Sequence, residues 1–125
     1  MFNTHFDHVG TIARKQSAIL ILEKIKSVNT KGYPVIVMGD FNMEDTHESI
    51  KQITKTLNDS KTVAKYVFGP EGTFNGFKFN EPVTKRIDFI FSSKQIKVNK
   101  YAVLSDNWNC QYPSDHLPVL VTVHF

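Results

Sequence analysis

Histidine, aspartate and asparagine recur in four short groups along the chain, and these side chains move protons and hold cations or phosphate oxygens. The groups are Asn3-Thr4-His5-Phe6-Asp7-His8, Gly39-Asp40-Phe41-Asn42, Arg86-Ile87-Asp88-Phe89-Ile90-Phe91 and Ser114-Asp115-His116-Leu117-Pro118. Together they offer a proton acceptor, an acid to orient it and donors for phosphate oxygens. Transfer of a phosphoryl group to water requires these parts together with cationic charge on the phosphate.

The second group follows the apolar run 35–38, which indicates a buried strand. Side chains two residues apart in an extended chain point the same way, so Asp40 and Asn42 are predicted to face one point. The alternative is an Asx turn that ends the strand, since Asp and Asn are both common turn residues.

Asp88 lies within a hydrophobic strand, where an unpaired charge would cost several kcal/mol on the order expected for burial. Two partners are open to it: Arg86, two residues away on the same face, or an imidazole that becomes cationic during a reaction. His116 can move protons near neutral pH, and with Asp115 it belongs either to an active loop or to a surface turn before Pro118.

The first group carries His5 and His8 at a spacing that invites a zinc interpretation. Cys110 is the only cysteine, which excludes a thiolate zinc site and an internal disulfide, and the His5 side chain fits better as a donor to phosphate oxygens. His47 and His124 are interpreted as incidental, and Arg14 as a helix-surface cation.

Hydrophobic periodicity indicates which elements position these groups. A strand is predicted over 2–6, a helix over 11–28 capped by Thr11, and a second helix after Asp45 or Thr46 that ends at the polar turn 58–60. The apolar stripe of the first helix is predicted to comprise Ile12, Ile19, Ile21, Leu22, Ile25 and Val28.

Strands are predicted over 85–91 and 96–104, joined as a hairpin through 92–95, and over 119–125. The segments 69–82 and 105–113 are rich in Gly, Pro, Asn and aromatic residues, which marks them as long loops that carry substrate contacts. Phe74, Phe77, Phe79 and Lys78 are candidates for one substrate wall.

Composition indicates one globular domain of 125 residues, with 41% hydrophobic and 22% charged positions. No apolar stretch approaches the roughly 20 residues of a membrane span, and no targeting signal indicates a compartment. The net charge of +3 mildly favours a polyanionic partner, but the chain lacks the basic stripe of a plain nucleic-acid-binding module.

The ordered set of four groups resembles the successive motifs of the endonuclease/exonuclease/phosphatase superfamily, the deoxyribonuclease I-like fold. Gly72-Thr73-Phe74-Asn75-Gly76 is also similar to the loop that many members place before the Ile-Asp strand. The resemblance implies a mixed, largely antiparallel β-sheet with helices on one face, as half of a four-layer α/β sandwich.

The resemblance also implies a role for each matching residue. His116 would be the general base on the attacking water, and Asp88 would orient its ring. His5 and Asn42 would bind phosphate oxygens, while Asp40 would position the nucleophile or assist the leaving group. Asp115, with Asp40 and Asn42, would belong to the metal site, and the cofactor would be Mg²⁺ or Mn²⁺. The substrate would be a phosphoester of nucleic acid or of a phosphorylated small molecule.

Family domains are about twice this length, and their first half supplies an asparagine and a glutamate that hold magnesium. Residues 1–125 are therefore expected to be the C-terminal half of such a domain. That half alone would expose an apolar sheet face and self-associate through it. The face is predicted to comprise Val35, Val37, Phe89, Phe91, Val119 and Val121. A magnesium-dependent phosphoester hydrolase and a catalytically incompetent half-domain remain as alternatives.

Overall fold

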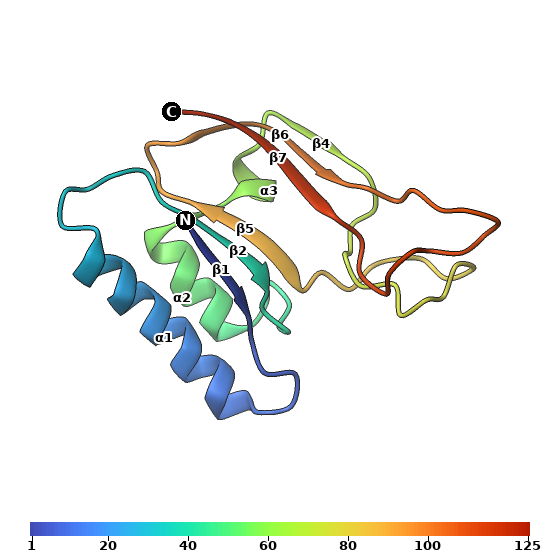
Figure 1. The fold of residues 1–125 in the computed structure, drawn as a ribbon, viewed down its shortest axis with the longest axis horizontal. Coiled ribbons are helices and arrows are strands. Elements are labelled where there is room, and N and C mark those ends of the chain that lie inside the picture. Colours follow the sequence, from blue (N-terminus) through green and yellow to red (C-terminus); the bar gives the residue numbers. More distant parts are fainter.

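The computed structural model describes all 125 residues and confirms a mixed α/β fold (Figure 1). One sheet has the strand order β1-β2-β5-β3 and is called sheet A here; the second, sheet B, has the order β4-β6-β7. The elements are β1 (Phe2–His5), α1 (Thr11–Val28), β2 (Ile36–Asp40), α2 (Glu48–Thr56), β3 (Asn58–Asp59), α3 (Ser60–Val63), β4 (Tyr66–Phe68), β5 (Asp88–Ser92), β6 (Lys97–Val103) and β7 (Val119–His124).

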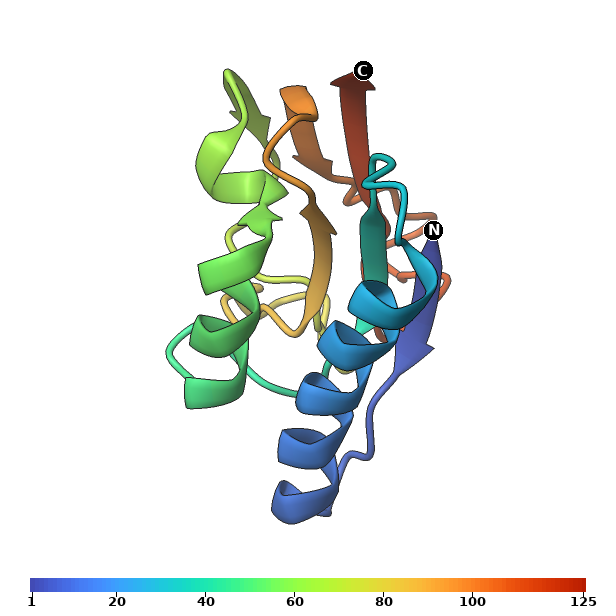
Figure 2. The same cartoon turned by 90° about the vertical axis from the view of Figure 1, so that its left-hand side faces the viewer.

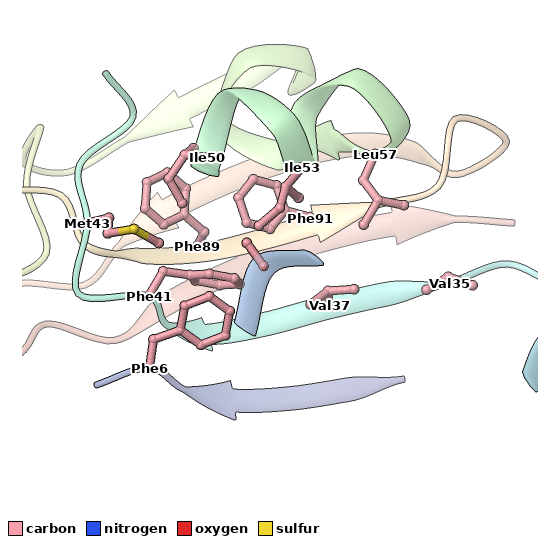
Figure 3. Packing of buried hydrophobic residues seen from close by; sticks show 11 residues of the cluster. Phe6, Val35, Val37, Phe41, Met43, Ile50, Ile53, Leu57, Phe89 and Phe91 are labelled. Carbon is pink, nitrogen blue, oxygen red and sulfur yellow. The ribbon is translucent and has the colours of Figure 1, made fainter. Parts of the chain in front are cut away.

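Helices α1 and α2 pack on the same face of sheet A (Figures 1 and 2). The core between them contains Phe89 and Phe91 of β5 beneath Ile50 and Ile53 of α2, and all four are nearly inaccessible to solvent (Figure 3). Phe41 lies at the centre, edge-on to both β5 rings. Because side chains alternate along a strand, Asp88 and Ile90 belong to the opposite face.

The predicted hairpin between the fifth and sixth strands is wrong. Strand β5 already pairs with β2 on one side and with β3 on the other, so no edge remains for β6. The chain instead turns at Ser93, whose N–H donates to the Val35 carbonyl at 2.9 Å, and continues into sheet B. There β6 pairs with β4 and β7.

The capping residues of both helices differ from the predicted ones, although α1 has the predicted bounds. Thr11 is the first helical residue rather than the cap, which is Gly10, and the Asp7 carboxylate accepts from the N–H groups of Val9 and Gly10. The second helix is capped by His47, whose Nδ1 accepts from the Ser49 N–H at 3.1 Å, so His47 is not incidental.

Two further details correct the sequence interpretation. The polar segment predicted as a turn at 58–60 forms the short strand β3 and the start of α3, which Asp59 caps. The buried side of α1 is narrower than predicted, because Ile12 and Val28 are exposed and Ala18 is the residue of this helix that is fully buried.

The predicted exposed sheet face is largely absent. Val35, Val37, Phe89 and Phe91 are each at most 6% exposed beneath α1 and α2, because they point toward the helices. Only Val119 and Val121 are partly exposed. The structure therefore gives no support to self-association through this set of residues.

No helix combines the length and the apolar character needed to cross a membrane.

Candidate active site

Three of the predicted site residues form a row across sheet A. His5 of β1 is the register partner of Asp40 of β2, and Asp40 is in turn the register partner of Asp88 of β5. Gly39 allows the first of these pairings: its φ is +140°, and a Cβ there would overlap the Thr4 carbonyl. Strand pairing thus brings together side chains that are far apart in the sequence.

His116 joins this row from the loop that precedes β7. Its Nδ1 lies 2.8 Å from Asp88 Oδ2, and its Nε2 lies 3.9 Å from Asp40 Oδ2. Of the two partners considered for Asp88, the structure selects the imidazole. The other side of the ring packs against Phe74, with ring centroids 5.1 Å apart.

Asp40 and Asn42 satisfy both interpretations of their motif at once. Asp40 Oδ1 accepts from the Asn42 N–H at 2.8 Å, which is an Asx turn, and Asn42 Nδ2 also donates to Asp40 Oδ2 at 3.1 Å. Asn42 has a φ of +50°, which asparagine tolerates better than most residues. Its Nδ2 further donates to the Phe6 carbonyl at 2.9 Å, which ties this turn to the strand that carries His5.

His5 and Asp115 stand at the edge of the arrangement. His5 Nε2 lies 3.3 Å from Asp40 Oδ2, and the His5 side chain is 74% exposed. Asp115 is not one of the three residues whose ligand atoms lie within 4.8 Å of one another, which are Asp40, Asp88 and His116. What fixes Asp115 is its backbone carbonyl, which accepts from the N–H groups of Asn75 and Gly76.

Two buried residues that sequence reasoning did not assign hold the site together. Thr73 Oγ1 accepts from the N–H groups of Ile87 and Asp88, each at 3.1 Å, while the Thr73 carbonyl accepts from Leu117 N–H at 2.7 Å. Asn75 Nδ2 donates to the Ser114 carbonyl at 3.0 Å. The sequence signal for both residues is their place in the Gly72-to-Gly76 loop, where the sequence indicates a role only for Phe74.

Arg86 stabilises the far side of the strand rather than the site. Its Nη2 lies 2.7 Å from Asp59 Oδ2 and 3.3 Å from Asp45 Oδ2, and its guanidinium stacks over the Phe89 ring. Burial alone would lower the pKa of Arg86, but hydrogen bonding and Coulomb attraction to Asp59 outweigh burial and raise it. Arg86 therefore pairs with Asp59 and Asp45, whereas Asp88 pairs with His116.

The row opens into a cleft of about 380 Å³ between sheet A and the segment that leads into β7. Its lining combines polar groups with an apolar floor, as ligand sites commonly do. The residues are Asn3, Met38, Gly39, Asp40, Asp88, Phe89, Ile90, Ser114, His116, Leu117, Pro118 and Val119.

The charge pattern of the cleft suits a cation. Asp40 and Asp88 lie directly opposite each other on antiparallel strands, and like charges in that position destabilise a sheet unless a counter-charge lies nearby. The carboxylate oxygens of Asp40 and Asp88 and the amide oxygen of Asn42 are of the kind that hard divalent cations such as Mg²⁺ prefer.

Comparison with known proteins identifies the family of this chain. Residues 3–116 match the model of the endonuclease/exonuclease/phosphatase family. No curated protein matched the chain in sequence. Among solved structures, a mannosyl-6-phosphatase of Bacteroides thetaiotaomicron VPI-5482 is 39% identical with a TM-score of 0.94, over 98% of this chain and 50% of that one.

Two more solved structures are similar. A conserved protein of unknown function from Enterococcus faecalis V583 is 34% identical (TM-score 0.88; 98% of this chain, 48% of that one). An endonuclease/exonuclease/phosphatase family protein of Bacteroides thetaiotaomicron is 38% identical (TM-score 0.89; 97% and 48%). The chain spans about half the length of these relatives. The family model, which matches residues 3–116, and the identity to these relatives show that this chain belongs to the endonuclease/exonuclease/phosphatase family.

Proposed function

We propose that the protein hydrolyses phosphoester bonds with the help of a divalent cation, and that His116 is the general base. The observation that carries the proposal is the contact of 2.8 Å between His116 Nδ1 and Asp88 Oδ2. An ionised carboxylate only accepts hydrogen bonds, so Asp88 favours the tautomer with the proton on Nδ1. Nε2 is then free to take a proton from water as the water oxygen attacks phosphorus.

The other residues of the row handle the phosphate and the cation. The exposed His5 is proposed to donate to the non-bridging oxygens, whose charge must be stabilised in the transition state. Asn42 is proposed to join it by exchanging its hydrogen bond to Asp40 Oδ2 for one to the phosphate. Asp40 is proposed to position the nucleophile or to assist the leaving group. Magnesium, or manganese in its place, would be held by Asp40 and Asn42, and it would supply charge neutralisation at the phosphate. Asp115 lies outside the cluster of ligand atoms and would contact the ion through its bound water.

The substrate class is proposed at the level of phosphoesters. The relative named as a mannosyl-6-phosphatase acts, by its name, on a sugar phosphate. Phosphomonoesters of sugars are therefore the first substrates to test, and nucleic acids and other phosphorylated small molecules follow.

A second candidate has a specific observation in its favour. The chain spans about half of its structural relatives, and we propose that residues 1–125 correspond to the C-terminal half of a family domain. On this account the chain folds through its own core of β1, β2, β5, α1 and α2 but does not turn over substrate without the residues of the other half.

Hydrolysis by the 125-residue chain separates the two candidates. We expect a magnesium-dependent release of phosphate from sugar phosphates or of nitrophenol from a nitrophenyl phosphodiester if the first holds, and chelation should abolish it. His116→Ala should then remove at least a hundredfold of the rate, on the order that general bases contribute, whereas His124→Ala, an exposed histidine outside the cleft, should not. Turnover that survives His116→Ala would refute the role of His116, and a folded chain without any turnover would favour the second candidate.

A further inference from the structure

Phe77 adopts a backbone conformation that aromatic residues rarely adopt. Its φ is +63°, in the left-handed region where glycine, asparagine and aspartate are the usual occupants. A bulky side chain in this region is a strained choice, and such strain persists only where the surrounding structure fixes it.

The strain comes from a type I′ turn that is built into the site. Gly76 has a φ of +59°, and the Lys78 N–H donates to the Asn75 carbonyl at 3.0 Å, so Gly76 and Phe77 are the two central residues of the turn. The Asn75 side chain fixes the turn, because its Oδ1 accepts from the Phe77 N–H at 2.6 Å.

The same Asn75 amide connects the turn to the catalytic loop. Asn75 is only 6% exposed, its Nδ2 donates to the Ser114 carbonyl, and its backbone N–H donates to the Asp115 carbonyl at 2.8 Å. One buried side chain thus holds both Phe77 and the segment that carries His116. The backbone of Phe77 is therefore tied through Asn75 to the segment that carries His116.

Packing does not explain the aromatic ring at this position. The Phe77 side chain is 65% exposed, whereas the neighbouring Phe74 packs on His116 and Phe79 packs on Tyr112. The loops that carry Phe77 and Tyr112 project together from one end of the molecule (Figure 1). A strained and exposed ring stabilises the free protein little, which points to a role in contact with a ligand.

We propose that Phe77 is a specificity-determining residue that stacks on a ring of the leaving group of a phosphoester bound at His116. The proposal rests on the function proposed above and narrows it to phosphoesters whose leaving group carries a flat or ring-shaped apolar face, such as a nucleoside or a sugar. Aromatic stacking of this kind corresponds to about a two- to tenfold change in Kd.

The test measures binding of phosphonates, which the protein does not hydrolyse, so it does not depend on turnover. Calorimetry with magnesium present would compare methylphosphonate, phenylphosphonate and cyclohexylphosphonate on the 125-residue chain. The variants are Phe77→Asn, which suits the left-handed turn, and the matched control Phe125→Asn, which replaces an exposed phenylalanine at the C-terminus.

We expect the wild type to bind at least one ring-bearing phosphonate several-fold more tightly than methylphosphonate. Phe77→Asn should remove that difference, leave methylphosphonate affinity unchanged, and keep or raise the thermal midpoint, because asparagine relieves the strain. A preference for phenylphosphonate indicates aromatic leaving groups, and a similar gain with cyclohexylphosphonate indicates sugar-like rings.

Three results would overturn the proposal. In the first, His116→Ala weakens the binding of methylphosphonate, but Phe77→Asn still binds ring-bearing phosphonates more tightly than methylphosphonate. The proposed role of Phe77 is then wrong, while the proposed function stands. A clear fall in the thermal midpoint of Phe77→Asn would show that the ring packs within the protein or against another segment. If no phosphonate binds, the proposed function and the role of Phe77 both fall.

Discussion

Replacement of Asp88 by asparagine tests the chemical core of the site directly. The carboxylate lies 2.8 Å from His116 Nδ1, and both side chains are partly shielded from water, with 20% and 29% of their surfaces exposed. A carboxylate cannot donate, so it compels Nδ1 to carry the proton. An asparagine amide can present either its oxygen or its NH₂ group and has no charge, so the preference for one tautomer weakens.

The size of the effect follows from the geometry. A short, partly buried hydrogen bond to a charged group contributes about 1.5–3 kcal/mol, which corresponds to about a ten- to hundredfold change in the tautomer ratio. Stabilisation of the imidazolium that forms during the reaction is lost as well. We therefore expect kcat to fall by at least the same factor, and by more if the wrong tautomer becomes dominant, as in other base-orienter pairs.

Nitrogen-15 NMR of the histidine rings measures the tautomer of His116 without any need for turnover. In the wild type we expect the neutral ring of His116 to carry its proton on Nδ1, and in Asp88→Asn we expect a mixture of the two tautomers or a reversal. Asp106→Asn, which changes an exposed carboxylate outside the cleft, is the matched control. Identical ring-nitrogen shifts of His116 in Asp88→Asn and the wild type would refute the assignment of Asp88 as the orienting acid.

Three further predictions concern the residues around the site. Asp59→Asn leaves the buried Arg86 guanidinium without its main counter-charge. We expect the free energy of unfolding, measured with urea, to fall by about 3 kcal/mol, and we expect the second substitution Arg86→Met to recover much of this loss. An unchanged urea midpoint in Asp59→Asn would contradict this prediction. Thr73→Val removes the acceptor of two backbone N–H groups, and we expect it to lower the free energy of unfolding by about 2 kcal/mol and to lower kcat. Thr73→Ser keeps the hydroxyl and should have wild-type stability and kcat. If the serine variant is as impaired as the valine variant, the hydroxyl does not have this role. Hydrogen bonds from Gly10 and Val9 lower the pKa of Asp7, so the stability advantage of the wild type over Asp7→Asn should be present near neutral pH and disappear as pH falls through the lowered pKa; an advantage that grows in acid would contradict the sign.

Much of the site could be predicted because its motifs lie at strand ends. Asp40 and Asn42 follow a continuous apolar run, and Asp88 lies in an otherwise hydrophobic strand, where its charge requires a partner. The convergence of His5, Asp40 and Asp88 then follows from strand pairing. The bounds of α1 were predicted correctly for a similar reason, since Gly32 and Pro34 end the helical pattern soon after Val28.

What could not be predicted depends on contacts between distant segments. A polar turn between two strands indicates a hairpin, yet the pairing of β5 with β3 takes the edge that β6 would need, and nothing local in Asn58 and Asp59 reveals that. The sequence does not show which face of a strand the helices will cover. For this reason the apolar residues of β2 and β5 are predicted on an exposed face, whereas in the structure they face the helices. Thr73 was missed because a buried hydroxyl that accepts from backbone N–H groups has no sequence signature of its own.

Strand β5 shows how the fold separates stability from chemistry. Its side chains alternate, so Phe89 and Phe91 are buried under the helices while Asp88 faces the cleft. The side chains of β5 that face the helices make apolar contacts, and substitutions of these side chains would lower the free energy of unfolding. The cleft side is held by hydrogen bonds from the backbone, above all those that Thr73 accepts. Errors in backbone position there would move the Asp88 carboxylate relative to His116, so the backbone contacts of β5 should govern catalytic geometry more strongly than the packing of its rings does.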